Sequence, residues 1–176
     1  ERPKGIFDLL SAFESICRDF NTKLVVVGDG TALDELRELV ERKELQTCVE
    51  VLGRKPHSEV MSILNMAAIV VCPSRREFPE GRCMSAMEAL VNGVPVVAPD
   101  YGPFPYLVEN EYNGLLYKVN STESMSDAVR ALLKDSELYD QVCQGARVSA
   151  KQLITPLRTF NEALEIGFSR LKQGTE

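Results

Sequence analysis

The sequence predicts an α/β fold built on a doubly wound parallel sheet with helices on both faces. Short apolar runs alternate with segments of helical apolar spacing along nearly the whole chain, which is the pattern of β-α-β units. The apolar runs are continuous rather than alternating, as in strands that are buried on both faces. The 176 residues are 44% hydrophobic and 26% charged, so we expect one globular domain over residues 1–176.

The first half of the chain contains two helix-strand units. Apolar spacing predicts helices from Ile6 to Phe20 and from Leu33 to Val40, and continuous apolar runs predict strands over 24–27 and 49–52. A doubly wound domain usually begins with a strand, whereas this chain begins with a helix. We therefore expect that the first strand of the sheet is missing and that the chain has been separated from a longer protein.

The second half continues the alternation. The same criteria predict helices over 57–67 and 86–91, strands over 67–72, 94–98 and 115–119, and a short helical turn over 105–109. Asn120 and Glu123 have the spacing of a capping box and are expected to open the next helix. Residues 136–176 are expected to form terminal helices with a break near Thr155 and Pro156.

Composition and charge exclude several classes of protein. A net charge of −6 argues against a sequence-independent nucleic-acid binder, which needs a basic face. No apolar run approaches the ~18 residues of a transmembrane segment. The five cysteines are scattered without a C-x-x-C pair and His57 is the only histidine, so we expect no metal site. Cysteines used as small core residues are typical of a reducing compartment, and we expect a cytoplasmic protein.

The loop after the first predicted strand, Gly28-Asp29-Gly30, is one candidate binding site. Amides at the start of the following helix could face a phosphate, and Glu50 lies near the position expected for an acidic ribose ligand. A dinucleotide fingerprint would have a third glycine where this chain has Leu33. An NAD-binding domain stays open as an alternative, although a tight strand-to-helix turn explains the two glycines adequately.

The loop and helix start over 73–89 are the second candidate. Glu80 is expected in the loop and Glu88 about one turn inside the helix, where their carboxylates could accept hydrogen bonds from vicinal hydroxyls of a sugar or ribose. The amides of residues 82–84 could face a phosphate at the helix N-terminus. On spacing alone, an equally good alternative is that Glu80 favours the helix dipole and Glu88 is a solvated surface residue.

An ordered set of motifs carries a family resemblance. The motifs are the segment 24–30, Val51-Leu52-Gly53, Val71-Cys72-Pro73-Ser74, the Glu80–Glu88 pair, Gly93–Ala98 and Asn113–Leu116. Together they resemble the C-terminal, Rossmann-like donor-binding domain of the GT4-type (group 1) retaining glycosyltransferases of GT-B architecture. The resemblance covers roughly residues 1–135. It implies binding of a UDP- or GDP-hexose, transfer to an acceptor hydroxyl with retention, no cofactor, and an N-terminal acceptor-binding domain in the full-length protein.

The resemblance also implies roles for individual residues. Lys4 would contact the donor diphosphate, Glu80 the sugar hydroxyls near the reacting carbon, and Glu88 the nucleotide ribose. The remaining residues of the implied binding site are Gly28, Gly30, Arg54 beside the base, and Gly81, Arg82, Cys83 and Met84 around the phosphate and sugar.

The chain departs from the family pattern in three places. The family's Gly-Phe-Gly appears as Gly81-Arg82-Cys83, its usual acidic residue after Pro105 is Tyr106, and the strand with its phosphate-binding arginine does not precede Lys4. A non-catalytic nucleotide-sugar-binding module therefore stays open as an alternative to an enzyme. For an enzyme, we expect this isolated domain to bind the donor but to be inactive in transfer, because transfer needs donor and acceptor held together.

Overall fold

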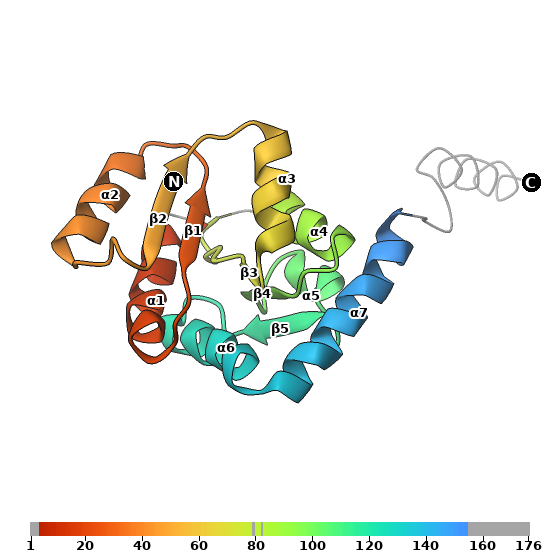
Figure 1. The fold of residues 1–176 in the computed structure, drawn as a ribbon. Coiled ribbons are helices and arrows are strands. Elements are labelled where there is room, and N and C mark those ends of the chain that lie inside the picture. The colour runs from red at the N-terminus through yellow and green to blue at the C-terminus, as the bar shows by residue number, and fades with distance from the viewer. Residues whose placement is uncertain (1–3, 79, 82, 155–176) are drawn as a thin grey trace, which may run out of the picture.

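The computed structural model describes residues 4–78, 80–81 and 83–154. In this part of the chain the elements are, in order, α1 (Ile6–Asp19), β1 (Leu24–Val27), α2 (Leu33–Arg42), β2 (Val49–Gly53), α3 (His57–Met66), β3 (Val70–Val71), α4 (Met84–Val91), β4 (Val96–Pro99), α5 (Phe104–Leu107), β5 (Gly114–Tyr117), α6 (Thr122–Lys134) and α7 (Ser136–Ile154). Figure 1 shows their arrangement in space.

The strand pairings within the described residues are all parallel, which confirms the predicted fold class. β1 pairs with β2, and β3, β4 and β5 form a three-stranded sheet in that order (Figure 1). The register places Val97 of β4 beside Val71 of β3 and Leu115 of β5. Because the strands of each sheet run in one direction, their carboxyl ends meet at one edge, where ligands of such sheets bind.

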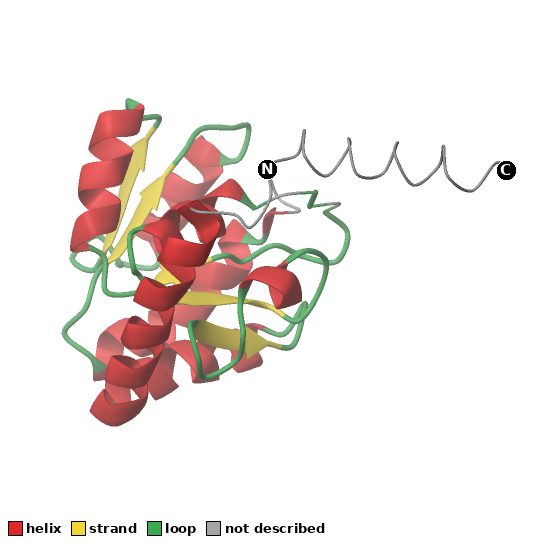
Figure 2. Ribbon diagram, turned by 90° about the vertical axis from the view of Figure 1, so that its right-hand side faces the viewer, coloured by secondary structure: helices red, strands yellow, loops and turns green. Residues whose placement is uncertain are grey.

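Helices pack on both faces of the three-stranded sheet (Figure 2). Every residue of β4 is buried, and its side chains alternate between two apolar clusters. Val97 belongs to the cluster that contains residues of α1 and α6, whereas Val96 and Ala98 belong to the cluster that contains residues of α4. Successive side chains of a strand point to opposite faces, so this alternation explains why β4 is a continuous apolar run.

The strand predicted over 67–72 is shorter at both ends. The run over 67–72 contributes only Val70 and Val71 to β3, because Ala67 still caps α3 and Pro73 has no N–H for a strand ladder. The predicted break near Thr155 and Pro156 lies outside the described residues.

The predicted capping box at Asn120 is wrong. Helix α6 begins at Thr122, and its cap is Ser121, whose hydroxyl accepts a hydrogen bond from the Ser124 N–H at 3.1 Å. Asn120 has a left-handed backbone with φ of 62°, a conformation that asparagine tolerates better than most residues. Its side chain is therefore free to serve another segment of the fold, as the site shows below.

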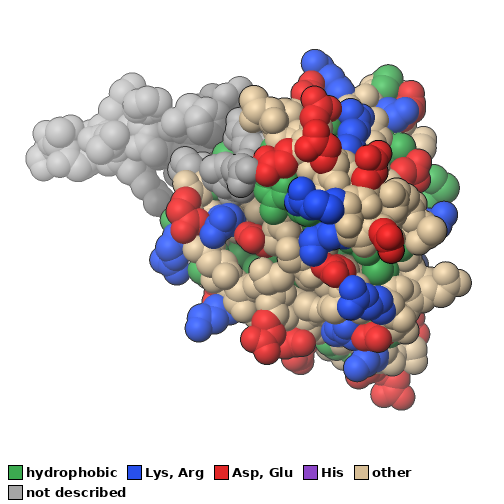
Figure 3. Space-filling model, turned by 90° about the vertical axis from the view of Figure 1, so that its left-hand side faces the viewer, with side chains coloured by type: hydrophobic (Ala, Val, Ile, Leu, Met, Phe, Trp, Pro, Cys, Tyr) green, Lys and Arg blue, Asp and Glu red, His purple; other side chains and the backbone are tan. Residues whose placement is uncertain are grey.

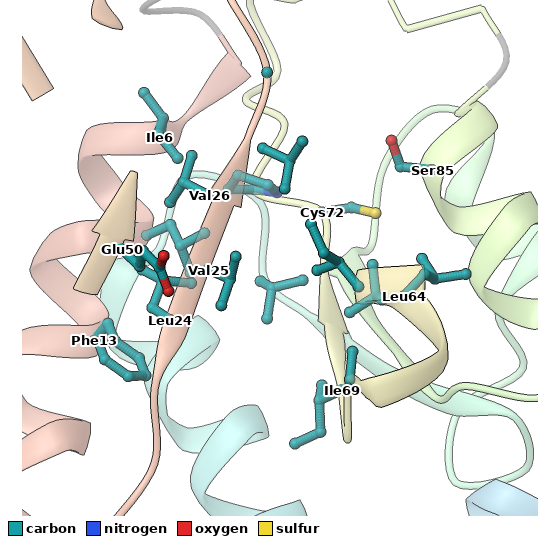
Figure 4. Close-up of a pocket in the computed structure, with 18 of the residues that line it drawn as sticks. Ile6, Phe13, Leu24, Val25, Val26, Glu50, Leu64, Ile69, Cys72 and Ser85 are labelled. Carbon is teal, nitrogen blue, oxygen red and sulfur yellow. The ribbon is translucent and has the colours of Figure 1, made fainter. Parts of the chain in front are cut away.

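A cavity of about 1140 Å³ lies between β1 and β3, which are not paired with each other in the described part of the chain. Its floor is apolar, with Val25 of β1, Phe13 of α1 and Leu64 of α3 among the lining side chains (Figure 4). Val25 is 39% exposed, although valines in the middle of a parallel sheet are usually buried. The cavity therefore leaves apolar strand surface uncovered.

The outer surface carries charges of both signs. On the face shown in Figure 3, Lys and Arg side chains are interspersed with Asp and Glu, and no extended basic patch covers it. Among the described residues, no helix has both the length and the apolar character needed to cross a membrane.

The first turn of α1 is held against the end of β3 by a close backbone approach. Gly5 caps α1 with φ of 72°, and a Cβ at this position would overlap the carbonyl oxygen of Pro73. Only glycine combines this backbone conformation with such a short separation. Gly5 therefore fixes the residue before it, Lys4, beside the loop that follows β3.

We predict that Gly5→Ala destabilises the fold more than Gly102→Ala. Both glycines have positive φ, but a Cβ on Gly102 would meet no atom within 4 Å. The left-handed conformation costs about 1–2 kcal/mol in each variant, and the overlap with Pro73 adds about 1–3 kcal/mol at position 5 alone. Urea denaturation of both variants measures the difference, and equal losses of unfolding free energy would contradict the close approach.

Candidate functional site

The candidate site is the polar mouth of the cavity, at the carboxyl ends of β1 and β3. The loop after β1 contributes Gly28 and Gly30, and the loop after β3 contributes Ser74 and Glu80. The start of α1 adds Lys4. The mouth therefore joins segments that are more than 70 residues apart in the sequence, as the parallel topology requires.

Glu80 is half-buried and held by a hydrogen bond inside its own loop. The Ser74 hydroxyl donates to Glu80 Oε2 at 3.2 Å, and the Glu80 N–H donates to the Phe78 carbonyl at 2.8 Å. Ser74 is itself buried. The carboxylate is thus fixed at the cavity with its other oxygen available to accept a hydrogen bond from a hydroxyl group.

Lys4 reaches the same loop from the other side of the mouth. Its ammonium nitrogen lies 5.0 Å from the centre of the Phe78 ring, a distance at which a cation is attracted to an aromatic face. Lys4 and Glu80 are therefore both in contact with Phe78 and bring opposite charges to the mouth of the cavity.

α4 supplies the opposite wall of the mouth. Met84 and Ser85 in its first turn and Glu88 one turn later line the cavity. Glu88 is half-buried, whereas Met84 is 54% exposed. The first-turn amides of this helix and the Glu88 carboxylate lie on the same cavity as Glu80, so the two carboxylates predicted to cooperate do share one site.

A network of charged and amide groups shapes the loop after β3. Arg75 Nε lies 3.4 Å from Asp8 Oδ2 and 3.6 Å from Glu77 Oε2. Asn120 accepts a hydrogen bond from the Arg76 N–H at 3.0 Å and donates one to Glu77 Oε1 at 3.1 Å. The loop is thereby tied to α1 on one side and to the start of α6 on the other.

No pattern in the sequence predicts this network. Asn120 was expected to cap a helix, and its partners lie more than 40 residues earlier in the chain. A lone Asn-Ser pair carries no signal for such a distant contact. The left-handed conformation of Asn120, visible only in the structure, is the feature that distinguishes it.

Cys83 caps α4 and contacts Cys72, the residue after β3. Their sulfur atoms are 3.7 Å apart, and both side chains are buried. The hydrogen bond between the two sulfur atoms lowers the pKa of the Cys83 thiol. The amides of Ala86 and Ser85 add to this effect, and burial opposes it. The same contact and burial raise the pKa of Cys72.

The structure separates three predicted residues from the cavity or leaves them undescribed. Arg54 is exposed on the loop after β2 and does not line the cavity. Gly81 is exposed and also lies outside the lining, next to Glu80. Arg82 lies outside the described residues.

Taken together, the mouth combines a cation, two carboxylates, a helix N-terminus and glycine turns above an apolar floor. The cation and the helix amides are suited to an anion such as phosphate. The carboxylates are suited to hydroxyl groups, which donate to them. Among the described residues, no group of three or more His, Cys, Asp and Glu side chains is arranged to hold a metal ion.

The sequence matches a known family over most of its length. Residues 1–149 match the glycosyl transferases group 1 family. An uncharacterised glycosyltransferase of Methanocaldococcus jannaschii is 32% identical over 149 residues, which cover 85% of this chain and 40% of the relative. The N-acetyl-alpha-D-glucosaminyl L-malate synthase of Bacillus anthracis is 29% identical over 146 residues, which cover 83% of this chain and 37% of that enzyme. The chain thus spans about two-fifths of these relatives.

Solved structures show the same fold. HepE of Anabaena, solved in complex with UDP, superposes with a TM-score of 0.79 at 22% identity, over 97% of this chain and 46% of HepE. The C-terminal domain of LpcC, a glycosyl transferase group 1 family protein of Francisella tularensis, superposes with a TM-score of 0.77 at 25% identity, over 86% of this chain and 80% of that domain. The chain is therefore a glycosyltransferase domain that belongs to the glycosyl transferases group 1 family.

Proposed function

We propose that the chain is the nucleotide-sugar-binding domain of a retaining glycosyltransferase that transfers a hexosyl unit from UDP- or GDP-hexose to an acceptor hydroxyl. The observation that carries the proposal is the presence of Lys4, Glu80 and Glu88 on one cavity mouth. The family match supports the reaction class. The complex of HepE with UDP supports a uridine nucleotide as the first ligand to test.

Each charged group has a distinct part in this proposal. Departure of the nucleoside diphosphate requires positive charge near the phosphates, and Lys4 together with the first-turn amides of α4 supplies it without a resident cofactor. Glu80 accepts hydrogen bonds from the sugar hydroxyls. Glu88 accepts hydrogen bonds from the ribose. Gly28 and Gly30 let the backbone approach the ligand on the side of β1.

We also propose that transfer needs a second, N-terminal domain that brings the acceptor. The relatives are more than twice as long as this chain, which supports further sequence in the whole protein. Donor and acceptor must be held in line for the reaction, and proximity supplies a large part of the rate. The chain alone then binds the donor without transferring it, and the whole protein acts in the cytoplasm.

The apolar cavity supports a further strand upstream of α1 in the whole protein. The Leu24 and Gly28 N–H groups donate hydrogen bonds to carbonyl groups at the start and the end of β2, and the Cys72 N–H donates to a carbonyl group of β4. Successive amides of a strand alternate in direction, so the Val25, Val27 and Val71 amides point into the cavity. Because Gly5 lies at the carboxyl end of this cavity, a strand leading into α1 would run parallel to β1 and β3, as a right-handed β-α-β crossover requires.

We predict that Glu88→Ala weakens UDP binding while the fold is retained. Loss of a hydrogen bond to a charged group costs about 1.5–3 kcal/mol, which is roughly 10- to 100-fold in the dissociation constant. Isothermal titration with UDP, GDP and NADH identifies the preferred nucleotide and measures the loss. The matched control is Glu38→Ala, which changes an exposed glutamate of α2 outside the cavity lining. Tightest binding of NADH, or equal affinities of the two variants, would overturn the assignment.

Lys4→Ala is expected to weaken UDP binding much more than uridine binding, because only UDP carries the diphosphate. Lys4→Arg should retain most of the affinity, since it keeps the charge. Lys23→Ala serves as the control, because Lys23 lines the same cavity at the opposite end of β1. Parallel titrations with UDP and uridine measure the difference, and equal losses for both ligands would place Lys4 away from the phosphates.

A strand added before residue 1 should protect specific amides. We expect an N-terminal extension of five alternating Val and Ile residues to slow hydrogen exchange of Val25, Val27 and Val71. The Leu24 and Cys72 amides already have partners and should change little. An extension of equal length with two prolines cannot form the ladder and serves as the control. Equal hydrogen exchange of these amides with both extensions would contradict the proposal. Protection of the same amides in the unextended chain that rises with protein concentration would also contradict it.

A further inference from the structure

Two thiols are in contact at the mouth, at the two ends of the loop that carries Glu80. Cys72 follows β3, and Cys83 caps α4. Their sulfur atoms are 3.7 Å apart, and both residues line the cavity. Figure 4 shows the sulfur of Cys72 directed toward the side of α4 and Ser85. The two cysteines are only 4% and 7% exposed, and because both line the cavity, the cavity is the route for a small reagent.

The surroundings of the two thiols shift their pKa values in opposite directions, so the two sulfurs can react one after the other. The hydrogen bond between the two sulfur atoms, together with first-turn amides of α4, lowers the pKa of Cys83. A lowered pKa increases the thiolate fraction, which is the nucleophilic form. Cys72 has a raised pKa and stays a thiol. A reactive thiolate beside a second thiol is the arrangement found in redox-responsive cysteine pairs.

We propose that Cys72 and Cys83 form a redox-active dithiol that hydrogen peroxide converts into an intramolecular disulfide. In the first step the Cys83 thiolate attacks the peroxide, the O–O bond breaks, and Cys83 becomes a sulfenic acid while one water leaves after protonation. In the second step the Cys72 sulfur attacks the Cys83 sulfur, the S–O bond breaks, and a second water leaves. The two thiols lose two electrons and two protons, and one peroxide is reduced to two waters.

Formation of the disulfide requires a small and directed movement. The sulfur separation must fall from 3.7 Å to about 2.05 Å. The Tyr117 hydroxyl donates to the Cys72 carbonyl at 3.2 Å, which holds the backbone of Cys72. Most of the movement therefore falls on Cys83 and the first turn of α4. The resulting ring contains Ser74 and Glu80.

The movement would act on the proposed donor site, and this step rests on the proposed function. The first turn of α4 carries Met84 and Ser85, which line the mouth, so drawing Cys83 toward Cys72 displaces one wall of the proposed donor site. We expect the disulfide form to bind UDP about fivefold or more weakly than the dithiol form. A bound UDP should in turn shield the thiols and slow their oxidation.

The chain contains its own comparison pair. Cys48, at the start of β2, is in contact with Cys17 of α1, and burial together with this contact raises the pKa of Cys48 to about 11. Neither residue lines the cavity. A Cys17→Ser, Cys48→Ser double variant therefore removes two of the five thiols without touching the proposed site.

The test is oxidation of the full chain with one equivalent of hydrogen peroxide, followed by alkylation and peptide mapping. We expect a bridge between Cys72 and Cys83, loss of two hydrogens from the intact mass, and reversal by dithiothreitol. The Cys17→Ser, Cys48→Ser variant should behave identically. In Cys72→Ser the sulfenic acid on Cys83 should persist and react with dimedone, and thermal melting checks that this variant is folded. If it is unfolded, the wild-type peptide map decides alone.

Several results would overturn the inference. A bridge that maps to Cys17 and Cys48, or no bridge at all, would show that the pair is not redox-active. Equal UDP affinities of the two redox forms would remove the link to the donor site. If neither form binds any nucleotide, the proposed function fails, while the peptide map still decides on the dithiol.

Discussion

The close approach of Gly5 to the Pro73 carbonyl is the constraint on which the geometry of the site depends. The two sheets share no strand pairing in the described residues, so they are held together by helix packing and by this backbone contact. α1 packs on α6 along one face, and its first turn is fixed at the end of β3. Because Lys4 precedes Gly5 and Ser74 follows Pro73, one contact brings both walls of the mouth together. No side chain larger than hydrogen is compatible with it.

Much of the fold could be predicted because burial leaves a periodic signal. The apolar run of β4 is continuous since its residues pack alternately into two clusters on opposite faces, and the helices show the complementary spacing. The cap of α6 could not be assigned correctly, because Asn120 and Ser121 are both good capping residues. What separates them is a contact of Asn120 with Arg76 and Glu77, which no local pattern contains.

The site was predictable to the extent that it follows the carboxyl ends of the strands. Topology alone brings Glu80 and Lys4 to one mouth, and helix spacing places Glu88 nearby. Arg54 follows a strand too, yet β2 lies on the side of β1 away from β3 (Figure 1), and Arg54 does not line the cavity. The Cys72–Cys83 contact has no sequence signature, because the two residues are 11 positions apart on a strand end and a helix cap, and only the path of the intervening loop brings them together.

The contacts within the mouth indicate which part of a donor would dominate its affinity. Glu80 already accepts a hydrogen bond from Ser74. A sugar hydroxyl at this carboxylate would add to that bond or replace it with one of similar strength, so the net gain in binding free energy is small. Within the described part of the chain, the Lys4 ammonium contacts the Phe78 ring, and a cation at an exposed aromatic face gains about 0.5–1 kcal/mol. A diphosphate offers this cation a charge-assisted hydrogen bond, which is roughly twice as strong as a neutral one. Under the proposed function, the geometry therefore favours affinity supplied mainly by the nucleotide, and Glu80 would select among sugars by where their hydroxyls lie.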